Sequence, residues 1–480
     1  MRKVDDQSTP GRVIVEDERT IRRATTAATL GNIAEWYDFG IYSYLAAVAL
    51  NHVFFPDAGD WSSVFTLGTF AAAFLARPFG GVILGPLGDR IGRTKVLSAT
   101  VLLMAIATLT LGLIPGYGTI GIAAPLIVLF IRMLQGFSAG GEYTGALTLV
   151  AEYAPDRRRG FFGSWLEFGT LVGYTLGAGI CATLITALSK EDLLSWGWRI
   201  PFMLALPIGI VGIYLRIRLE ETPAFRQLME RSPAMATMSL RGVFRILVTR
   251  YRSAALIAGG LVVAWNVTNY VLTNYIPTYL TGTLPDHGHS GVSEAMSTTL
   301  QVAVMVAMLC VVVFLGRLSD RIGRKPILAT GSLSLILLGL PSTWLLQKGF
   351  TGQIAGLAIM GFTLVCFASV TPSTLPALFP AFIRYGSLAI IFNLFVSAFA
   401  GTAPTVIGVA VTTTGNLDWP GYYLIGAGVI GIISTFFLKE PAGAPMTGDA
   451  PLASSADLPS PRLSGSGVPL ENPPSPRHSP

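Results

Sequence analysis

Long apolar runs alternate with short polar segments along most of the chain. Each run has about the 20 residues that an α-helix needs to cross a bilayer. A polar, arginine-rich stretch at 220–252 separates two sets of six runs. The runs lie at 25–50, 64–87, 96–114, 120–141, 161–188 and 199–215, and then at 253–280, 296–315, 327–346, 354–379, 387–411 and 422–438. We therefore predict an all-α integral membrane protein with twelve transmembrane helices, six in each of two halves at 25–219 and 253–440, joined by a linker at 220–252.

The two ends of the chain are polar. Residues 1–24 are mixed in charge and lack the apolar core of a cleavable signal peptide, so the first helix is expected to act as the insertion signal. Residues 441–480 are rich in Pro, Ser and Gly and almost free of large apolar residues. We predict that this tail is disordered. It has no heptad pattern, so no coiled coil is expected there.

Lysine and arginine in the short loops gather on one side of the predicted helices. That side holds, among others, Arg22, Arg23, Arg90, Arg93, Lys95, Arg157, Arg158, Arg159, Arg321, Arg324, Lys325, Arg384 and Lys439. The other side holds Lys190, Arg199 and Lys348. Basic loops face the cytoplasm. We therefore expect a multi-pass protein of the cell (plasma) membrane with both termini in the cytoplasm.

Composition supports a membrane protein and disfavours other classes. Only 12% of the 480 residues are charged and the mean hydropathy is +0.59, whereas soluble domains carry about 25% charged residues. The net charge of +6 is accounted for by the basic loops, so nucleic-acid binding is not expected. The sequence offers no nucleophile–base pair, metal-ligand cluster or P-loop. We expect no enzyme activity, no ATP-driven pump, no cofactor, no metal and no obligate protein partner.

One loop motif occurs twice. GPLGDRIGRTK at 85–95 recurs as GRLSDRIGRKP at 316–326, after the second helix of each half. Such a repeat indicates related halves that pack about an axis along the membrane normal. Both loops resemble the G-x-L-x-D-R-x-G-R motif of the major facilitator superfamily. The resemblance implies a gate on the cytoplasmic side that is formed by Gly85, Asp89, Arg90, Arg93, Asp320, Arg321 and Arg324.

Further segments resemble the metabolite:H+ symporter subfamily. They are RMLQGFSAGGEYTGA at 132–146, EYAPDRRRGFFGSWLEFG at 152–169, WGWRIPF at 196–202, LEETPAF at 219–225 and STLPALFP at 373–380. Together with NVTNY at 266–270 and IRY at 383–385, they are most similar to the branch that carries proline and betaine. Sibling branches carry α-ketoglutarate, citrate or shikimate. The resemblance implies proton-coupled solute transport by alternating access.

Two carboxylates, Glu35 and Asp38, lie in the first apolar run. A charge at the centre of a bilayer costs about 2.5–3.5 kcal/mol on the translocon scale, and residues three apart share a helix face. Two such acids cannot both ionise cheaply, so we predict that they bind a proton and that Arg132 helps to release it. Proton coupling is predicted for Asp38, Glu35, Arg132, Glu142 and Glu167. For Asp38, Glu35 and Arg132 the alternative to proton coupling is a static ion pair that holds helices together. For Glu142 and Glu167 the alternative is packing at the membrane interface. Arg77 has either a structural or a coupling role.

A zwitterionic solute needs a donor for its carboxylate and aromatic faces for its ammonium group. We predict that Arg132 binds the carboxylate and that the second half supplies neutral hydrogen bonds. The predicted substrate-binding residues are Arg132, Tyr37, Trp265, Asn266, Asn269 and Tyr270. Packing is the alternative for each aromatic residue.

The leading hypothesis is a symporter whose partners are H+, a small solute of the proline or glycine betaine type and the lipid bilayer. Two alternatives stay open. One is a symporter of dicarboxylates or other organic acids, because Arg77 and Arg132 together would suit two carboxylates. The other is a membrane sensor that carries no solute and is built on the same scaffold.

Overall fold

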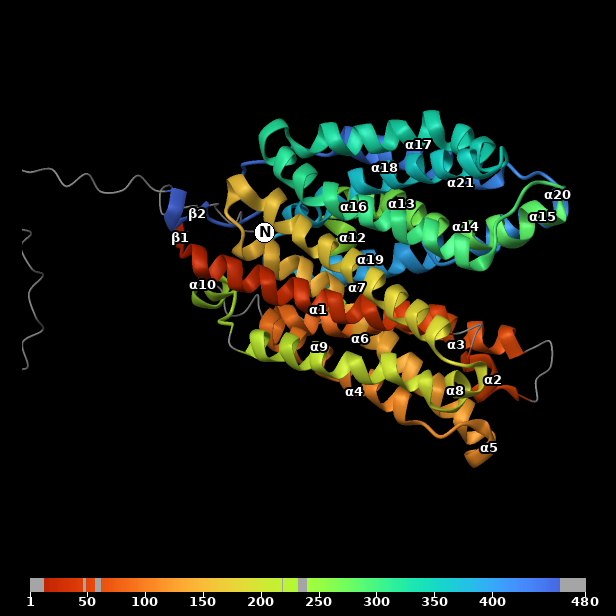
Figure 1. Cartoon of the computed structure of the whole chain (residues 1–480). Helices are drawn as coiled ribbons and strands as arrows, with labels where there is room; N and C mark the ends of the chain where they lie inside the picture. Colours follow the sequence, from red (N-terminus) through yellow and green to blue (C-terminus); the bar gives the residue numbers. More distant parts are fainter. Residues whose placement is uncertain (1–12, 46–48, 57–61, 218, 232–239, 458–480) are drawn as a thin grey trace, which may run out of the picture.

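The computed structural model describes residues 13–45, 49–56, 62–217, 219–231 and 240–457. Twelve long helical segments form two groups of six that lie side by side (Figure 1). The first group comprises α1 (Glu18–Leu45), α3 (Ser62–Ile91), α4 (Arg93–Leu113), α6 (Ala123–Tyr153), α7 (Arg159–Ala187) and α9 (Arg199–Ile217). The predicted fold of twelve transmembrane helices in two halves is confirmed.

The second group contains two segments in which the helix passes through π-helical turns. One runs from α13 (Arg252–Tyr270) through α14 (Ile276–Thr278) to α15 (Leu284–Asp286), and the other from α19 (Arg384–Phe395) to α20 (Ala403–Thr414). The remaining helices are α16 (Glu294–Ile322), α17 (Arg324–Leu346), α18 (Phe350–Thr374) and α21 (Trp419–Phe437). Among the described residues, ten segments are long and apolar enough to cross a membrane by length and composition; α1 and α3 complete the twelve.

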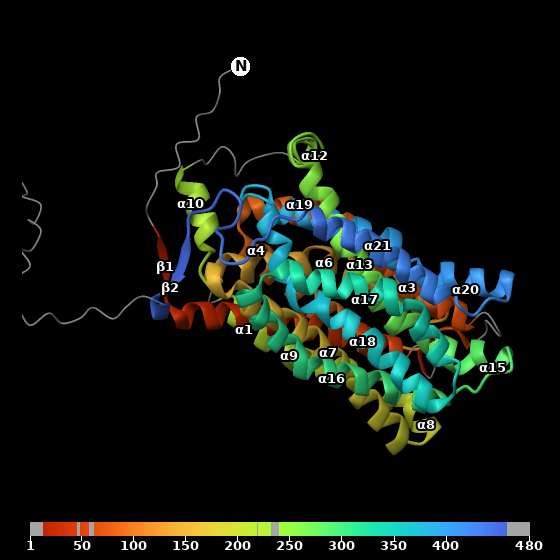
Figure 2. The same cartoon turned by 90° about the horizontal axis from the view of Figure 1, so that it is seen from above.

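The two ends of the bundle differ. The short helices α2 (Asn51–Phe54), α5 (Tyr117–Ile120) and α8 (Lys190–Asp192) lie at one end with α15 and α20 (Figures 1 and 2). At the opposite end lie β1 (Ile14–Glu16), β2 (Leu452–Ser454) and the linker helix α10 (Pro223–Arg231). We call this second end the termini side. The halves meet where α3 packs against α19 and α7 packs against α16.

Small residues bring α3 and α6 into backbone contact inside the first half. A Cβ atom on Gly80 would lie 1.9 Å from the carbonyl oxygen of Phe137, and one on Gly140 would lie 2.2 Å from that of Arg77. No side chain fits at either position, and close helix packing in membranes depends on such residues. The result is that Arg77 lies directly beside α6.

Two segments outside the predicted transmembrane helices contain regular structure. The linker holds α10 and α12 (Leu240–Thr249), with residues 232–239 outside the described part of the chain. In the tail, β2 pairs in parallel with β1, with Ile14 opposite Leu452. The prediction of a disordered tail is therefore wrong for residues 441–457, because buried Met446 and Leu452 dock there. Residues 458–480 and 1–12 lie outside the described residues.

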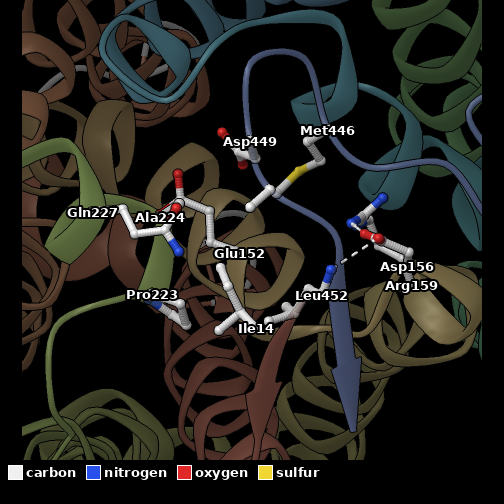
Figure 3. A pocket seen from close by; sticks show the side chains of 11 residues that line it. Ile14, Glu152, Asp156, Arg159, Pro223, Ala224, Gln227, Met446, Asp449 and Leu452 are labelled. Atoms are coloured by element: carbon white, nitrogen blue, oxygen red, sulfur yellow. Dashed lines mark hydrogen bonds and ion pairs between the residues drawn. The ribbon is translucent and has the colours of Figure 1, made fainter. Parts of the chain in front are cut away.

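Residues 441–457, which we call the strap, bond to both halves at the termini side. In the first half, Asp156 accepts a hydrogen bond from the Leu452 amide at 3.0 Å, and Arg159 donates one to the Ala444 carbonyl at 3.1 Å. In the second half, Asp449 pairs with Arg384 at 2.9 Å. Burial raises the pKa of the Asp449 carboxyl above its ordinary value and the Arg384 guanidinium opposes that rise. Docking of Asp449 therefore depends on Arg384. A small pocket beneath the strap is lined by Asp156, Arg159, Asp449 and Leu452, among others, and by residues of α10 (Figure 3).

Truncation after Glu440 should loosen the termini side, because the strap joins the two halves there. Each charge-assisted hydrogen bond is worth roughly 1.5–3 kcal/mol. We expect a cysteine placed at Ala381 in a cysteine-free background to be labelled at least about fivefold faster in the truncated protein, which corresponds to roughly 1 kcal/mol. Asp449→Asn should give part of this effect. The matched control is Asp286→Asn, an exposed carboxylate at the opposite end. Equal labelling rates in all variants would contradict a role for the strap.

Candidate functional site

Asp38 of α1 lies in a complete hydrogen-bond network within the first half. Its carboxylate lies 3.2 Å from Nη1 of Arg132 and accepts hydrogen bonds from Thr108 Oγ1 at 2.7 Å and Gln135 Nε2 at 2.9 Å. All four side chains are buried. A buried charge is tolerated when it is paired and hydrogen-bonded in this way. The predicted association of Asp38 with Arg132 is present in the structure.

Arg132 is held on more than one side. It also donates a hydrogen bond to Gln135 Oε1 at 2.8 Å, and its guanidinium carbon lies 4.1 Å from the centre of the Tyr42 ring. Contacts within the first half therefore occupy this arginine. The structure places it as the partner of Asp38, and it does not bring Arg132 to the second half as the expected role in binding solute would require.

Glu35 has a different partner, Arg77 of α3. The closest nitrogen and oxygen of the pair are 3.9 Å apart, and both side chains are fully buried. Within the described part of the chain, neither oxygen of Glu35 and none of the three guanidinium nitrogens of Arg77 has a hydrogen-bond partner. Buried polar groups are nearly always hydrogen-bonded. This pair therefore has unused capacity for a polar ligand.

Aromatic rings of the first half surround Arg77, and one of them contacts the second half. Its guanidinium carbon lies 6.0 Å from the centre of the Trp36 ring, 5.8 Å from that of Phe39 and 5.7 Å from that of Phe74. Phe74 meets Tyr270 of α13 edge-on, with 5.6 Å between ring centres. The buried Tyr270 hydroxyl also has no hydrogen-bond partner among the described residues. The site of Glu35 and Arg77 therefore extends to the second half through Tyr270.

A second cluster joins the halves through Tyr143 of α6. Its ring stacks on Phe392 at 5.0 Å and lies 5.9 Å from Trp265, while its hydroxyl donates a hydrogen bond to Glu167 at 2.7 Å. Glu167 also accepts a hydrogen bond from Thr170. Trp265 and Glu167, two predicted site residues, are thereby placed around one tyrosine where α6, α13 and α19 meet.

The remaining predicted site residues lie apart from Arg77. The Tyr37 hydroxyl donates to the Pro201 carbonyl at 2.8 Å and so packs inside the first half. Asn266 donates to the Val262 carbonyl of its own helix, and Asn269 is half-buried. Glu142 pairs with Arg216 of α9 at 3.2 Å. Nothing in these contacts assigns Tyr37 to a solute site.

The aspartates of the repeated loops bridge the halves. Asp89 accepts hydrogen bonds from the Tyr385 and Gly386 amides at 3.3 and 2.7 Å, at the start of α19. Asp320 accepts them from the Gly160 and Phe161 amides at 2.7 and 2.8 Å, at the start of α7. Each carboxylate thus caps a helix N-terminus in the other half, where the helix dipole favours negative charge.

Arginines of the same loops extend these contacts. Arg93 pairs with Asp89 at 3.2 Å and with Glu152 at 3.3 Å, and Glu152 also binds Arg384 of the second half at 2.7 Å. Arg324 pairs with Asp320 at 3.4 Å and donates to Ser373 at 2.9 Å. The predicted close approach of Gly85 is present, because a Cβ atom there would lie 2.5 Å from that of Ala389. The halves are therefore in contact at the termini side.

Two loop residues differ from the expectation. Arg90 and Arg321 are exposed and form no ion pair in the described part of the chain. Two glutamates that were not predicted as gate residues form contacts with these loops instead. Glu221 accepts hydrogen bonds from the Arg93 and Thr94 amides at the start of α4, and Glu440 accepts them from the Arg324 and Lys325 amides at the start of α17. A second repeat could have revealed them, since LEETPA at 219–224 matches LKEPA at 438–442.

Comparisons with known proteins agree with this architecture. Residues 24–243 match the family described as Sugar (and other) transporter. The chain is 46% identical over 448 residues to the glycine betaine/proline/ectoine/pipecolic acid transporter OusA of Dickeya dadantii, covering 92% of this chain and 88% of that protein. It is 45% identical over 451 residues to the proline/betaine transporter of Escherichia coli, with the same coverage.

Solved structures show the same fold. The proton:xylose symporter XylE bound to 6-bromo-6-deoxy-D-glucose superposes with a TM-score of 0.73 at 18% identity, over 90% of this chain and 98% of that one. A human organic anion transporter gives a TM-score of 0.63 at 17% identity, over 87% and 99%. The chain is therefore a transporter and not an enzyme, and it belongs to the major facilitator superfamily, in the same family as the proline/betaine transporters.

Proposed function

We propose that this protein takes up small zwitterionic osmolytes of the proline and glycine betaine type, driven by protons that enter with them. The observation that carries the proposal is the buried guanidinium of Arg77, which has no hydrogen-bond partner among the described residues and lies among aromatic rings of the first half that reach Tyr270 of the second. Arg77 would bind the carboxylate of the solute as a bidentate pair. The ring faces of Trp36, Phe74 and Tyr270 would surround its ammonium group.

A single carboxylate suits this site better than two. Arg132, the second arginine near α1, already binds Asp38 and Gln135. All three guanidinium nitrogens of Arg77 lack a hydrogen-bond partner in the described part of the chain, whereas Arg132 is already held by Asp38 and Gln135, and this favours a zwitterion over a dicarboxylate. The names of the two relatives agree, since proline, betaine, ectoine and pipecolic acid each pair one carboxylate with a cationic nitrogen.

Proton coupling follows from competition for Arg77. When the carboxylate of the solute binds Arg77, Glu35 loses the one counter-charge that lies within ion-pair distance. An isolated carboxylate is unfavourable in a low-dielectric site, so Glu35 takes up a proton. Solute and proton then occupy the site together, and their release restores the pair of Glu35 and Arg77.

We infer that the protein lies in the plasma membrane and that its termini side faces the cytoplasm. The basic loops lie at that side. Contacts of Asp89, Asp320 and Glu152 between the halves are formed there, so the structure represents a state closed towards the cytoplasm. Opening of these contacts would release solute and proton inside, as alternating access requires.

Uptake by purified protein in liposomes tests the proposal. We expect labelled proline to accumulate when the outside is acidic and a protonophore to abolish that accumulation. Excess glycine betaine should block uptake, whereas excess α-ketoglutarate should leave it unchanged. Block by α-ketoglutarate alone would indicate an organic-acid symporter, unchanged accumulation with the protonophore would exclude proton coupling, and absence of any flux would indicate the non-transporting sensor.

A further inference from the structure

The first half contains a small polar cavity that lies away from the contact between the halves. It is enclosed by α1, α4, α6 and α9, and Glu35, Thr108 and Glu142 supply its polar lining. Ala105, Ala205 and Gly209 leave the space that larger side chains would fill. The cavity offers about 10 Å3 to the centre of a water molecule, which is roughly what one bound water needs.

Several carboxylate oxygens at this cavity, and two nitrogens of Arg216 beside Glu142, lack hydrogen-bond partners among the described residues. Both oxygens of Glu35 and Oε2 of Glu142 are buried without a hydrogen bond in the described part of the chain, and so are Nε and Nη2 of Arg216. A water molecule between the two carboxyl groups would satisfy several of these atoms. Thr108 lines the same cavity and donates to Asp38, so this acid is linked to it as well.

The charged groups around Glu35 form a path along which a proton can leave it towards the termini side. Glu35 faces Arg77 of α3, Arg216 of α9, Glu142 of α6 and Asp38 of its own helix. Glu142 faces Arg216, to which it is paired at 3.2 Å, and the Tyr385 phenol of α19. Arg216 lies in the last turn of α9, which ends at Ile217 just before the linker. The series of Glu35, Glu142 and Arg216 thus runs from the solute site to the termini side.

We propose that the proton leaves Glu35 through this cavity, by way of one water and Glu142, within the first half, whereas the solute crosses between the halves. This rests on the proposed proton coupling at Glu35. In the transfer, the Glu35 acid gives its proton to the water, and the water gives one to the Glu142 carboxylate. Glu35 becomes a carboxylate that pairs again with Arg77. Glu142 gives the proton to water that enters when the termini side opens, and as a carboxylate it pairs again with Arg216.

The variant Glu142→Gln distinguishes a role of Glu142 in proton transfer from a purely structural role. The variant should exchange internal for external labelled proline at close to the wild-type rate, because exchange needs no net proton movement. Accumulation driven by a pH gradient, and proton entry reported by an internal pH dye, should fall at least about tenfold, the scale of a lost acid–base group. A residue that only holds helices together would lower exchange and accumulation equally.

Two further variants keep the test decisive if Glu142→Gln folds poorly. Glu142→Gln/Arg216→Gln removes both charges and should show the same separation. Ala205→Val fills the cavity with all charges intact and should also lower coupled accumulation more than exchange. Gly426→Val is its control, since a Cβ atom at Gly426 meets nothing within 4 Å.

The outcomes are distinguishable. Wild-type protein that accumulates proline without a proton requirement overturns both the proposed function and this route. Coupled accumulation that survives in Glu142→Gln and in Ala205→Val overturns the route alone. Equal loss of exchange and accumulation in all three variants assigns Glu142, Arg216 and the cavity to folding and also overturns the route.

Discussion

Replacing both members of the pair, Glu35→Gln with Arg77→Gln, is expected to abolish detectable binding of proline and betaine. Arg77 is a buried cation whose three guanidinium nitrogens all lack a hydrogen-bond partner in the described part of the chain. Loss of a desolvated, hydrogen-bonded charge partner weakens binding by about 2–5 kcal/mol, or roughly 30- to 4,000-fold. Neutralising both partners together avoids leaving one buried charge alone, so the effect on folding should be small. Titration of the purified variant with labelled glycine betaine measures the loss.

A matched variant in the same half provides the control. Asp38→Asn with Arg132→Gln also neutralises one buried pair, but that pair is hydrogen-bonded to Thr108 and Gln135 within the first half. We expect its affinity for betaine to stay within about threefold of wild type, that is within roughly 0.7 kcal/mol. If this variant loses affinity and the variant of Glu35 and Arg77 keeps it, the carboxylate of the solute binds Arg132, as the sequence alone had suggested.

The fold was largely predictable because transmembrane helices are encoded locally. A run of apolar residues specifies a helix whatever surrounds it, and the repeated loops at 85–95 and 316–326 indicated two related halves. Composition could not predict that part of the C-terminal tail is ordered. Residues 441–457 are ordered because Asp449, Met446 and Leu452 meet surfaces that only the folded bundle creates.

Which arginine pairs with which acid could not be predicted from the sequence. Glu35 and Asp38 share α1 and are three residues apart, yet each has its own arginine from a different helix. Which arginine meets which acid depends on the depth of α3 against α6, and Gly80 and Gly140 set that depth by backbone contact. Spacing along one helix carries no information on this packing, so Arg132 seemed the better candidate for the solute.

Charged residues near helix ends were also undervalued. Glu152, Arg216 and Arg384 lie close to polar loops in the sequence, where an ion is ordinarily solvated. In the structure all three are buried, and Glu152 and Arg384 connect the two halves. The burial of Glu152 and Arg384 arises from contact between the halves, which is present in only one of the states that alternating access requires. Sequence patterns of one half do not report it.

Glu152→Gln is therefore expected to shift the protein strongly towards the state that is open at the termini side. Glu152 lies between Arg93 of the first half and Arg384 of the second, and all three are fully buried. Removing one partner of a buried ion pair costs about 3–5 kcal/mol, and here the cost falls on the closed state because opening hydrates both arginines. The equilibrium should move by roughly 150- to 5,000-fold, at 1.36 kcal/mol for each factor of ten.

Labelling of a cysteine at Ala381 measures this shift, since Arg93 reaches the Ala381 carbonyl when the halves are together. Glu221→Gln is the matched control, because Glu221 caps α4 within the first half and its loss weakens a helix end without favouring either state. Equally fast labelling in Glu152→Gln and Glu221→Gln would show that the bridge stabilises the first half as a whole and does not control its separation from the second.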